Sequence, residues 1–177
     1  VGGNAIASIT ATESLTFDGV LHGTVATTLN SGVQFQTTAA IATGKAFAEN
    51  GNSTTAITAL HATKAADLSA INTNTVTAAA TAATDGTITF TGDFGKATVA
   101  ITGGDGGAND IFNVDGATMN TASFTVATNS VLQGSAAKLT GVTVTGDGTT
   151  AVTALHTTKT ADLSGIDTTT TTAAFDG

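Results

Sequence analysis

The sequence contains no cysteine, proline, tryptophan or tyrosine, and arginine is also absent. Without cysteine, disulfide bonds, thiolate catalysis and cysteine-based metal sites are excluded. Only 10% of the residues are charged, and five lysines stand against thirteen acidic residues, which gives a net charge of −8. Binding to nucleic acid needs clustered Lys and Arg, so the composition argues against it, and equally against an anionic membrane surface. The acidity fits a protein that meets divalent cations, or one whose charge keeps a Thr- and Ala-rich surface soluble.

Catalytic motifs are missing as well. The chain has no GxSxG elbow, no Walker loop and no dinucleotide fingerprint, and without Trp or Tyr a sugar-binding cleft would lack its usual stacking platform. We therefore do not expect an enzyme. No stretch is long and apolar enough to span a bilayer, and no secretory signal is visible. Because the chain begins at Val1, we expect a processed protein or a piece of a longer one.

What the sequence does have is 41 threonines, 21 glycines and many Ala and Val residues. β-Branched Thr and Val suit pleated strands, and Gly with Asn and Asp supplies turns. Apolar and polar residues alternate with a period of two in four segments, at 14–17, 87–91, 97–101 and 142–145. These segments predict half-buried strands with one Thr-covered face.

An internal repeat is the most informative feature. Residues 54–75 (TTAITALHATKAADLSAINTNT) and 149–170 (TTAVTALHTTKTADLSGIDTTT) are identical at sixteen of twenty-two positions. After the first copy the chain continues with TITFTGDFGKATVAITGG, whereas the second copy stops where that continuation would begin. Either the chain is part of a longer array, or a neighbouring subunit supplies the missing edge. We divide the chain into related modules at 1–86 and 87–177.

Inside the repeat, Ile57, Leu60, Leu68 and Ile71 are spaced near the helical period, which predicts a short helix from Thr55 to about Lys64, capped by Thr54 or Thr55. The segment DLSAI is either a further turn of that helix or the start of a strand. His61 and His156 recur at equivalent positions, so we expect a packing or helix-end role for them; His22 stands by itself. No HxH or HExxH spacing indicates a metal site.

A glycine- and aspartate-rich segment, GGDGGANDIF from Gly103 to Phe112, resembles the calcium repeat of the bacterial RTX proteins. In those repeats Asp side chains and backbone carbonyls supply the oxygen ligands that Ca²⁺ prefers. The resemblance implies Asp105, Asn109 and Asp110 as calcium ligands. The segment departs from the pattern by one inserted residue and has no second consecutive copy. The alternative is a Gly-rich loop followed by a strand at 111–114.

Runs such as AVTALHTTKTADLSGIDTTTT and GVTVTGDGTT give the whole chain a wider resemblance. It is similar to the repeat regions of bacterial S-layer proteins and of large adhesins secreted by the type I pathway. That resemblance implies an extracellular position on the bacterial cell surface, calcium-supported assembly, and a C-terminal rather than an N-terminal secretion signal.

Together these features predict a mainly β protein, a parallel β-solenoid or β-roll-like stack with short helices; tandem β-sandwich modules are the rival. Solenoid turns need neighbours to bury their ends, so we expect end-to-end packing with another copy. Two functions remain open. One is a structural self-assembling surface module (S-layer, sheath or filament), and the other is a calcium-stiffened adhesin segment that binds glycan or ice. Thr-x-Thr pairs at 87/89/91 and 143/145 are the reason for considering ice binding, because regular rows of Thr are typical of some ice-binding proteins. The solvent-facing side of an ordinary strand would explain these pairs too.

Overall fold

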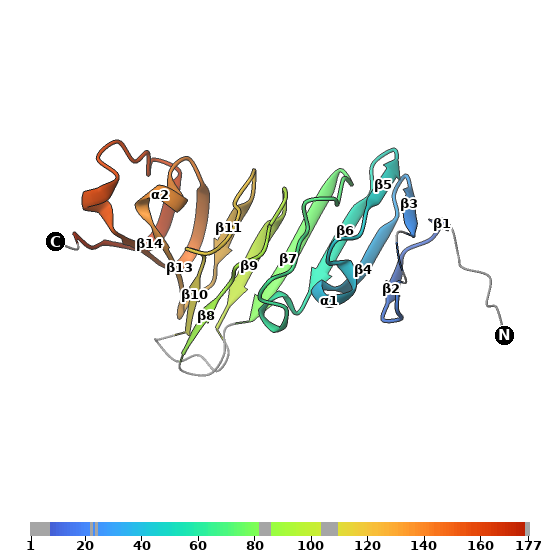
Figure 1. Ribbon diagram of the computed structural model, residues 1–177, viewed down its shortest axis with the longest axis horizontal. Coiled ribbons are helices and arrows are strands. Elements are labelled where there is room, and N and C mark those ends of the chain that lie inside the picture. Colours follow the sequence, from blue (N-terminus) through green and yellow to red (C-terminus); the bar gives the residue numbers. More distant parts are fainter. Residues whose placement is uncertain (1–7, 22, 24, 82–85, 104–109, 176–177) are drawn as a thin grey trace.

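The computed structural model describes residues 8–21, 23, 25–81, 86–103 and 110–175. Within these ranges half of the residues are in strands, and the chain winds through about eight turns of a β-solenoid. The strands stack along the long axis of the molecule, with β1 at one end and β14 at the other (Figure 1). The predicted parallel β-solenoid is confirmed, and tandem β-sandwiches are not formed.

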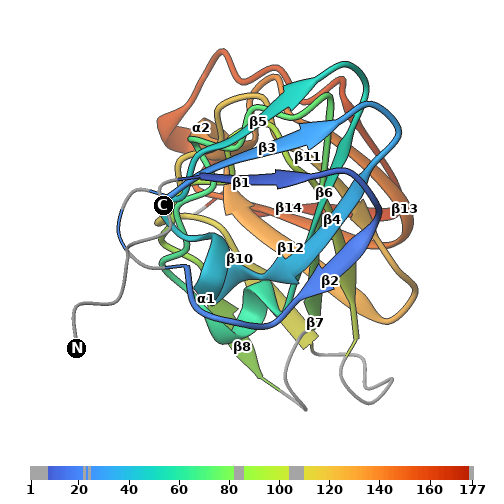
Figure 2. The ribbon, with the colours of Figure 1, turned by 90° about the vertical axis from the view of Figure 1, so that its right-hand side faces the viewer.

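In the first half, two columns of parallel strands are built by successive turns. One column contains β1 (Ser8–Ala11), β3 (Ala26–Asn30) and β5 (Phe47–Asn50). The other contains β2 (Leu15–Phe17), β4 (Gln34–Thr38), β6 (Thr54–Thr58) and β7 (Thr75–Thr81). Ser8 pairs with Ala26 and Thr27 with Phe47, so a turn takes about twenty residues. Viewed along the stack, the strands surround a common interior (Figure 2).

Strand β7 carries the sheet from the first half of the chain into the second. Its residues 75–78 pair with β6, and its residues 77–81 pair with β9. The column that follows contains β9 (Thr98–Thr102), β11 (Ser123–Val126), the start of β13 (Thr143–Thr153) and β14 (Ile166–Ala173). A new column contains β8 (Thr87–Thr89), β10 (Asp110–Asn113), β12 (Ser130–Ser135) and the end of β13. The modules 1–86 and 87–177 stay a prediction, and strand pairing continues across their boundary.

Short helical turns occupy the corners that follow the second strand of some turns. They are α1 (Ala39–Ala42), α2 (Ala136–Leu139) and two single turns of 3₁₀ helix, η1 (Leu60–Ala62) and η2 (Leu155–Thr157). The Thr38 hydroxyl caps α1 by accepting from the Ile41 N–H at 3.4 Å.

The prediction of a helix from Thr55 to Lys64 is wrong. Residues 54–58 form β6 with alternating burial, because a run of β-branched side chains fits a pleated strand better than a helix. Ala59 then adopts a left-handed conformation with φ 54°, and only one helical turn, η1, follows. The DLSAI segment is a turn that ends in a bridge between Ile71 and Phe47.

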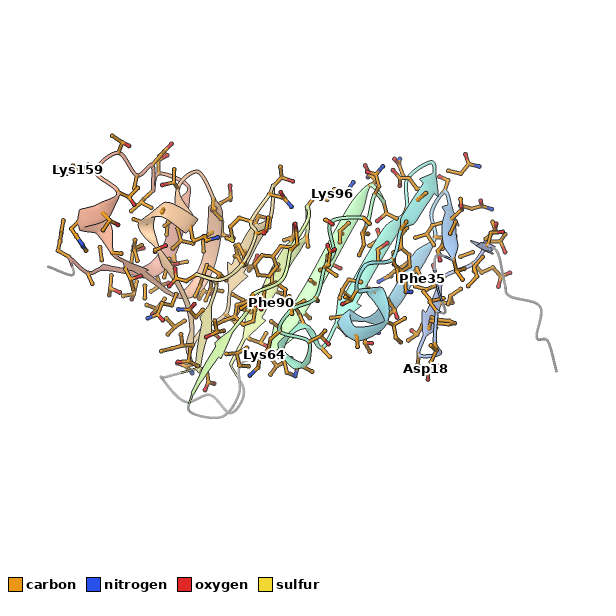
Figure 3. All side chains as sticks on the ribbon, viewed as in Figure 1. Asp18, Phe35, Lys64, Phe90, Lys96 and Lys159 are labelled. Atoms are coloured by element: carbon orange, nitrogen blue, oxygen red, sulfur yellow. The ribbon has the colours of Figure 1, made fainter. Side chains whose placement is uncertain are left out.

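Phenylalanine fills the interior in two stacks. Phe35 lies between Phe17 and Phe47, with ring centroids 6.0 and 5.3 Å apart. Farther along, Phe90 and Phe94 stack at 4.3 Å, and the rings of Phe112 and Phe124 extend this second group. Figure 3 shows Phe35 and Phe90 inside the stack. Each turn thus adds apolar side chains to one continuous core, which only neighbouring turns can cover.

Side-chain hydrogen bonds hold two polar corners, one buried and one partly exposed. The Thr73 hydroxyl donates to Thr55 Oγ1 at 2.9 Å, and both side chains are fully buried. At a second corner the Glu49 carboxylate accepts from the Ser53 N–H, the Ser53 hydroxyl and the Asn74 N–H. Burial raises the pKa of Glu49, but these hydrogen bonds, with a contribution from Lys96, hold it below its ordinary value.

No helix among the described residues is both long and apolar enough to cross a membrane.

Candidate interaction site at the C-terminal end of the solenoid

The two copies of the repeat fold alike, so that their residues can be compared one by one. Ala59 and Ala154 both take the left-handed conformation, with φ 54° and 51°. The buried threonine pair of the first copy recurs as Thr168 donating to Thr150 at 3.1 Å. Differences between equivalent residues therefore report on their surroundings and not on local structure.

The two copies differ in how deeply their apolar side chains are buried. Three large side chains of the first copy are 0 to 3% exposed, namely Leu60, Leu68 and Ile71. Their counterparts are only partly buried against the core, namely Leu155, Leu163 and Ile166. Ala66 is fully buried, whereas its counterpart Ala161 is also only half-buried. Among the described residues, the second copy is therefore not covered by a layer such as the one that covers the first copy.

Inside the chain, that covering layer is the segment that follows the first copy. The Thr91 N–H donates to the Lys64 carbonyl at 2.7 Å, and the Asp93 N–H donates to the Ala66 carbonyl at 2.9 Å. In return the Leu68 N–H donates to the Asp93 carbonyl at 2.9 Å. Phe90 and Phe94, from the same segment, are fully buried. Residues 87–102 thus cover the first copy by backbone bonds and by aromatic burial.

The equivalent backbone groups of the second copy have no such layer. Over the described ranges, no backbone N–H donates to the carbonyls of Lys159 or Ala161, and the Leu163 N–H reaches no backbone acceptor. An open groove of about 380 Å³ lies here, lined by Leu155, His156, Thr158, Lys159, Ala161 and Phe175. One backbone N–H and two carbonyls without backbone partners, beside half-buried apolar side chains, are groups that a further turn of solenoid would cover.

Strand β14 is the edge of the sheet at this end. In the part of the chain that the structure describes it pairs with β13 and with no other strand. Its core-facing positions are exposed, namely Thr171, Ala173 and, just beyond the strand, Phe175. The counterparts of these three residues in β7 are 1 to 4% exposed, namely Val76, Ala78 and Ala80. Phe175 exposes 74% of its surface, although each of the other seven phenylalanines lies in or against the core.

Charges at the C-terminal end are few and of both signs. Lys159 and Asp162 are exposed on the turn between η2 and β14. The Ser164 hydroxyl and N–H donate to Asp162 and hold the pKa of that carboxyl below its ordinary value. This surface is therefore largely apolar and Thr-covered, and its exposed charged side chains among the described residues include Lys159, Asp162 and, on β14, Asp167.

The opposite end of the stack is also uncovered. Within the described residues, β1 pairs only with β3 and β2 only with β4. Leu15 and Val20 are 37% and 70% exposed there, and Phe17 is half-buried. Both ends of the solenoid thus expose apolar side chains and strand edges.

The predicted calcium ligands fall mostly outside what the structure describes. Asp105 and Asn109 lie outside the described residues. Asp110 begins β10, is fully buried and pairs with Ser130. The described residues contain no group of three His, Asp or Glu side chains that could hold a metal ion. Calcium binding remains a prediction, and the strand predicted at 111–114 is present as β10.

Of the histidines, His61 has a structural partner, because its Nδ1 accepts from the Thr81 N–H at 3.0 Å. This agrees with the expected packing role at the η1 turn. His156 is exposed beside the groove at the C-terminal end, and His22 lies outside the described residues.

The Thr-x-Thr pairs lie on two different columns, with 87/89 on β8 and 143/145 on β13. The β13 pair continues into two ranks of small residues across four paired strands. One rank is Thr77, Thr98, Ser123 and Thr143, and the other is Ala79, Ala100, Thr125 and Thr145. Residues of both ranks are exposed, except the half-buried Ser123. The sequence spacing hid this order, because the turns differ in length.

End-to-end packing was expected from the sequence, but not the residues that would carry it. The signal was present in the repeat, because Leu155, Leu163 and Ile166 are the counterparts of residues that 87–102 cover.

Comparison with known protein families, with curated proteins and with solved structures finds no match.

Proposed function

We propose that this chain is a structural module that self-associates end to end in an extracellular layer, sheath or filament. The observation that carries the proposal is the uncovered C-terminal end, where apolar side chains and backbone amides remain exposed although the same residues of the first copy are buried. Among the described residues Phe175 is exposed and β14 pairs with β13 alone, so this surface offers apolar side chains and a strand edge to a further turn of solenoid.

Composition supports the same function. A cysteine-free, acidic chain rich in Thr, Ala and Gly is similar in composition to bacterial surface proteins, which supports the proposal of an extracellular position. A parallel stack with a continuous core is also a suitable rigid spacer, since each turn is held by its neighbours. We propose no catalytic role.

Sedimentation velocity and negative-stain electron microscopy over a wide range of protein concentration test this function. We expect linear rods whose length grows with concentration. A chain that remains monomeric at every concentration would overturn the proposal.

The same experiment repeated with a calcium chelator tests the role of calcium separately. Loss of rods on addition of a chelator, and their recovery with Ca²⁺, would support a role for Asp105, Asn109 and Asp110. If Ca²⁺ changes neither assembly nor melting temperature, the calcium proposal fails while the structural one stands.

A second candidate function is supported by the two ranks of small residues on β7, β9, β11 and β13. Adjacent strands lie about 4.8 Å apart, so these methyl and hydroxyl groups form a regular array without charge. Such an array suits an adhesin segment that binds ice or glycan. Inhibition of ice recrystallisation, lost in Thr98→Lys, would favour ice binding, and a glycan array would test the other ligand. No activity in either assay would exclude this candidate.

A further inference from the structure

We infer that Ca²⁺ binds inside one corner of the solenoid, between the Asp110 carboxylate, the Ser130 hydroxyl and the Asn129 backbone carbonyl. This inference rests on the calcium part of the proposed function and names ligands for it. Only Asp110 belongs to the set that the sequence resemblance implies. Asn129 and Ser130 lie on the next turn of the chain, outside the Gly- and Asp-rich segment.

Three oxygen atoms surround one point beside Gly103, the residue that directly follows β9. A Cβ at this position would lie 3.1 Å from Asp110 Oδ2, and 3.5 Å from both Ser130 Oγ and the Asn129 carbonyl oxygen. The three atoms belong to a carboxylate, a hydroxyl and a backbone carbonyl, which are the hard oxygen ligands that Ca²⁺ prefers. Because residue 103 has no side chain, these oxygens share a common space, which we call the Gly103 site.

Two of the three oxygens lie on buried side chains at the start of neighbouring strands. Asp110 begins β10 and is fully buried, and Ser130 begins β12 and is 1% exposed. Within the described part of the chain no hydrogen-bond partner reaches Ser130 Oγ. A buried hydroxyl without a partner is unfavourable unless water or an ion satisfies it, and buried carboxylates commonly coordinate metals. The Ser130 hydroxyl is therefore an independent indication of a ligand at this corner.

The strand geometry favours a cation of the size of Ca²⁺. Asp110 and Ser130 are direct partners in the parallel pair of β10 and β12. Neighbouring strands lie about 4.8 Å apart, which is about twice the length of a Ca–O bond, about 2.3–2.6 Å. Mg²⁺ requires shorter bonds, about 2.0–2.1 Å, in a near-ideal octahedron. An anion does not fit, because an ionised carboxylate and a carbonyl only accept hydrogen bonds.

The third oxygen comes from an exposed turn. Asn129 takes a left-handed backbone conformation with φ 65°, which Asn adopts more readily than most residues, and it is exposed. Water can therefore reach this side of the Gly103 site and complete the coordination of an ion. Because the three ligands carry a single formal charge, we expect weak binding, with a Kd of about 10⁻⁴–10⁻³ M. A bound ion would connect three passes of the chain and stiffen the corner.

Melting of the whole chain with and without Ca²⁺ tests the site. After removal of metal, we expect Ca²⁺ at a tenfold excess over its Kd to raise the melting temperature by about 3–6 °C, and Mg²⁺ at the same concentration to have little effect. Asp110→Asn should abolish the response to Ca²⁺. Gly103→Ala should also weaken binding, because its Cβ would occupy the space between the three oxygens. Isothermal titration calorimetry measures the affinity directly.

Ser130→Ala distinguishes a calcium ligand from a structural residue. Removal of an unpartnered buried hydroxyl should leave the melting temperature of the metal-free chain unchanged or raise it. The same change should lower the affinity for Ca²⁺ about tenfold, as expected for the loss of one interaction with a charged group. Thr27→Val is the matched control. Thr27 Oγ1 is a second buried oxygen without a partner among the described residues, and β3, on which it lies, is far from β10 along the stack (Figure 1). This control should not change the response to Ca²⁺.

The outcomes separate this inference from the proposals on which it rests. If Asp110→Asn abolishes binding but Gly103→Ala and Ser130→Ala leave the affinity unchanged, the ion does not bind at the Gly103 site, while the calcium proposal stands. If Ser130→Ala lowers the melting temperature of the metal-free chain without changing the affinity for Ca²⁺, the hydroxyl binds a water molecule and the inference is overturned. If Ca²⁺ does not bind to the unchanged chain, both calcium proposals fail, while the structural function, which the rods test, stands. If Asp110→Asn does not fold, Gly103→Ala and Ser130→Ala still decide the site.

Discussion

Leu60 and Leu155 hold the same position in the two repeat copies, and a parallel Leu→Ala substitution measures how differently they are covered. Leu60 is fully buried, and truncation of a buried leucine costs about 2–5 kcal/mol. Leu155 is half-buried, so less apolar surface returns to water and the groove beside it already admits solvent. We expect Leu155→Ala to cost about 1 kcal/mol, since the loss scales with the area removed from water.

For a chain of this size 1 kcal/mol corresponds to a shift of about 2–4 °C in melting temperature. Leu60→Ala should therefore lower the melting temperature by about 4–20 °C, and Leu155→Ala by about 2–4 °C. Far-ultraviolet circular dichroism or calorimetry is the suitable assay, because the chain has neither Trp nor Tyr for fluorescence. Measurements belong at concentrations where the chain is monomeric. Equal destabilisation by the two substitutions would refute the reasoning, because it would mean that the C-terminal end is as well covered as the first copy.

Three further predictions concern single contacts. Glu49→Gln should flatten the acid limb of a plot of melting temperature against pH. The pKa of Glu49 is lower in the folded chain than in the unfolded chain, so the ionised carboxylate stabilises the fold above about pH 4, and this stabilisation is lost as the pH falls. An unchanged acid limb would contradict this. Thr73→Val should cost about 1–3 kcal/mol by leaving the buried Thr55 hydroxyl without its donor, and the double change Thr55→Val with Thr73→Val should cost less than the sum of the single changes in urea unfolding. Strict additivity would show that the two hydroxyls are not coupled. Gly92→Ala should destabilise the monomer by about 1–3 kcal/mol or more, since its Cβ meets a backbone carbonyl, whereas a small effect would place Gly92 away from Ala66.

Much of the fold followed from the sequence because its signals are local. Period-two alternation located β2, β8, β9 and the start of β13, and the repeat gave the solenoid. The helical spacing of Ile57, Leu60, Leu68 and Ile71 was misleading, because Ile57 points inward from a strand and the other three line successive corners of one turn. Residues from different faces of a solenoid all point to one interior, so their spacing imitates a helix.

The candidate site was only half predictable. The repeat identified which residues of the two copies are equivalent, but the exposure of Leu155 and Phe175 depends on which turn lies next to them, and this is a property of stacking. The passage of β7 from one column to the next was equally hidden, because it depends on how two neighbouring turns of different length pair.

Amide hydrogen exchange compared between the two repeat copies is the most direct measurement of the central claim. In dilute solution we expect residues 155–173 to exchange faster than their counterparts 60–78, in spite of the near-identical sequence, because no described residues cover them as 87–102 cover the first copy. On self-association residues 155–173 should become as well protected as their counterparts. Equal protection of both copies in the dilute monomer, or no change on concentration, would contradict the account.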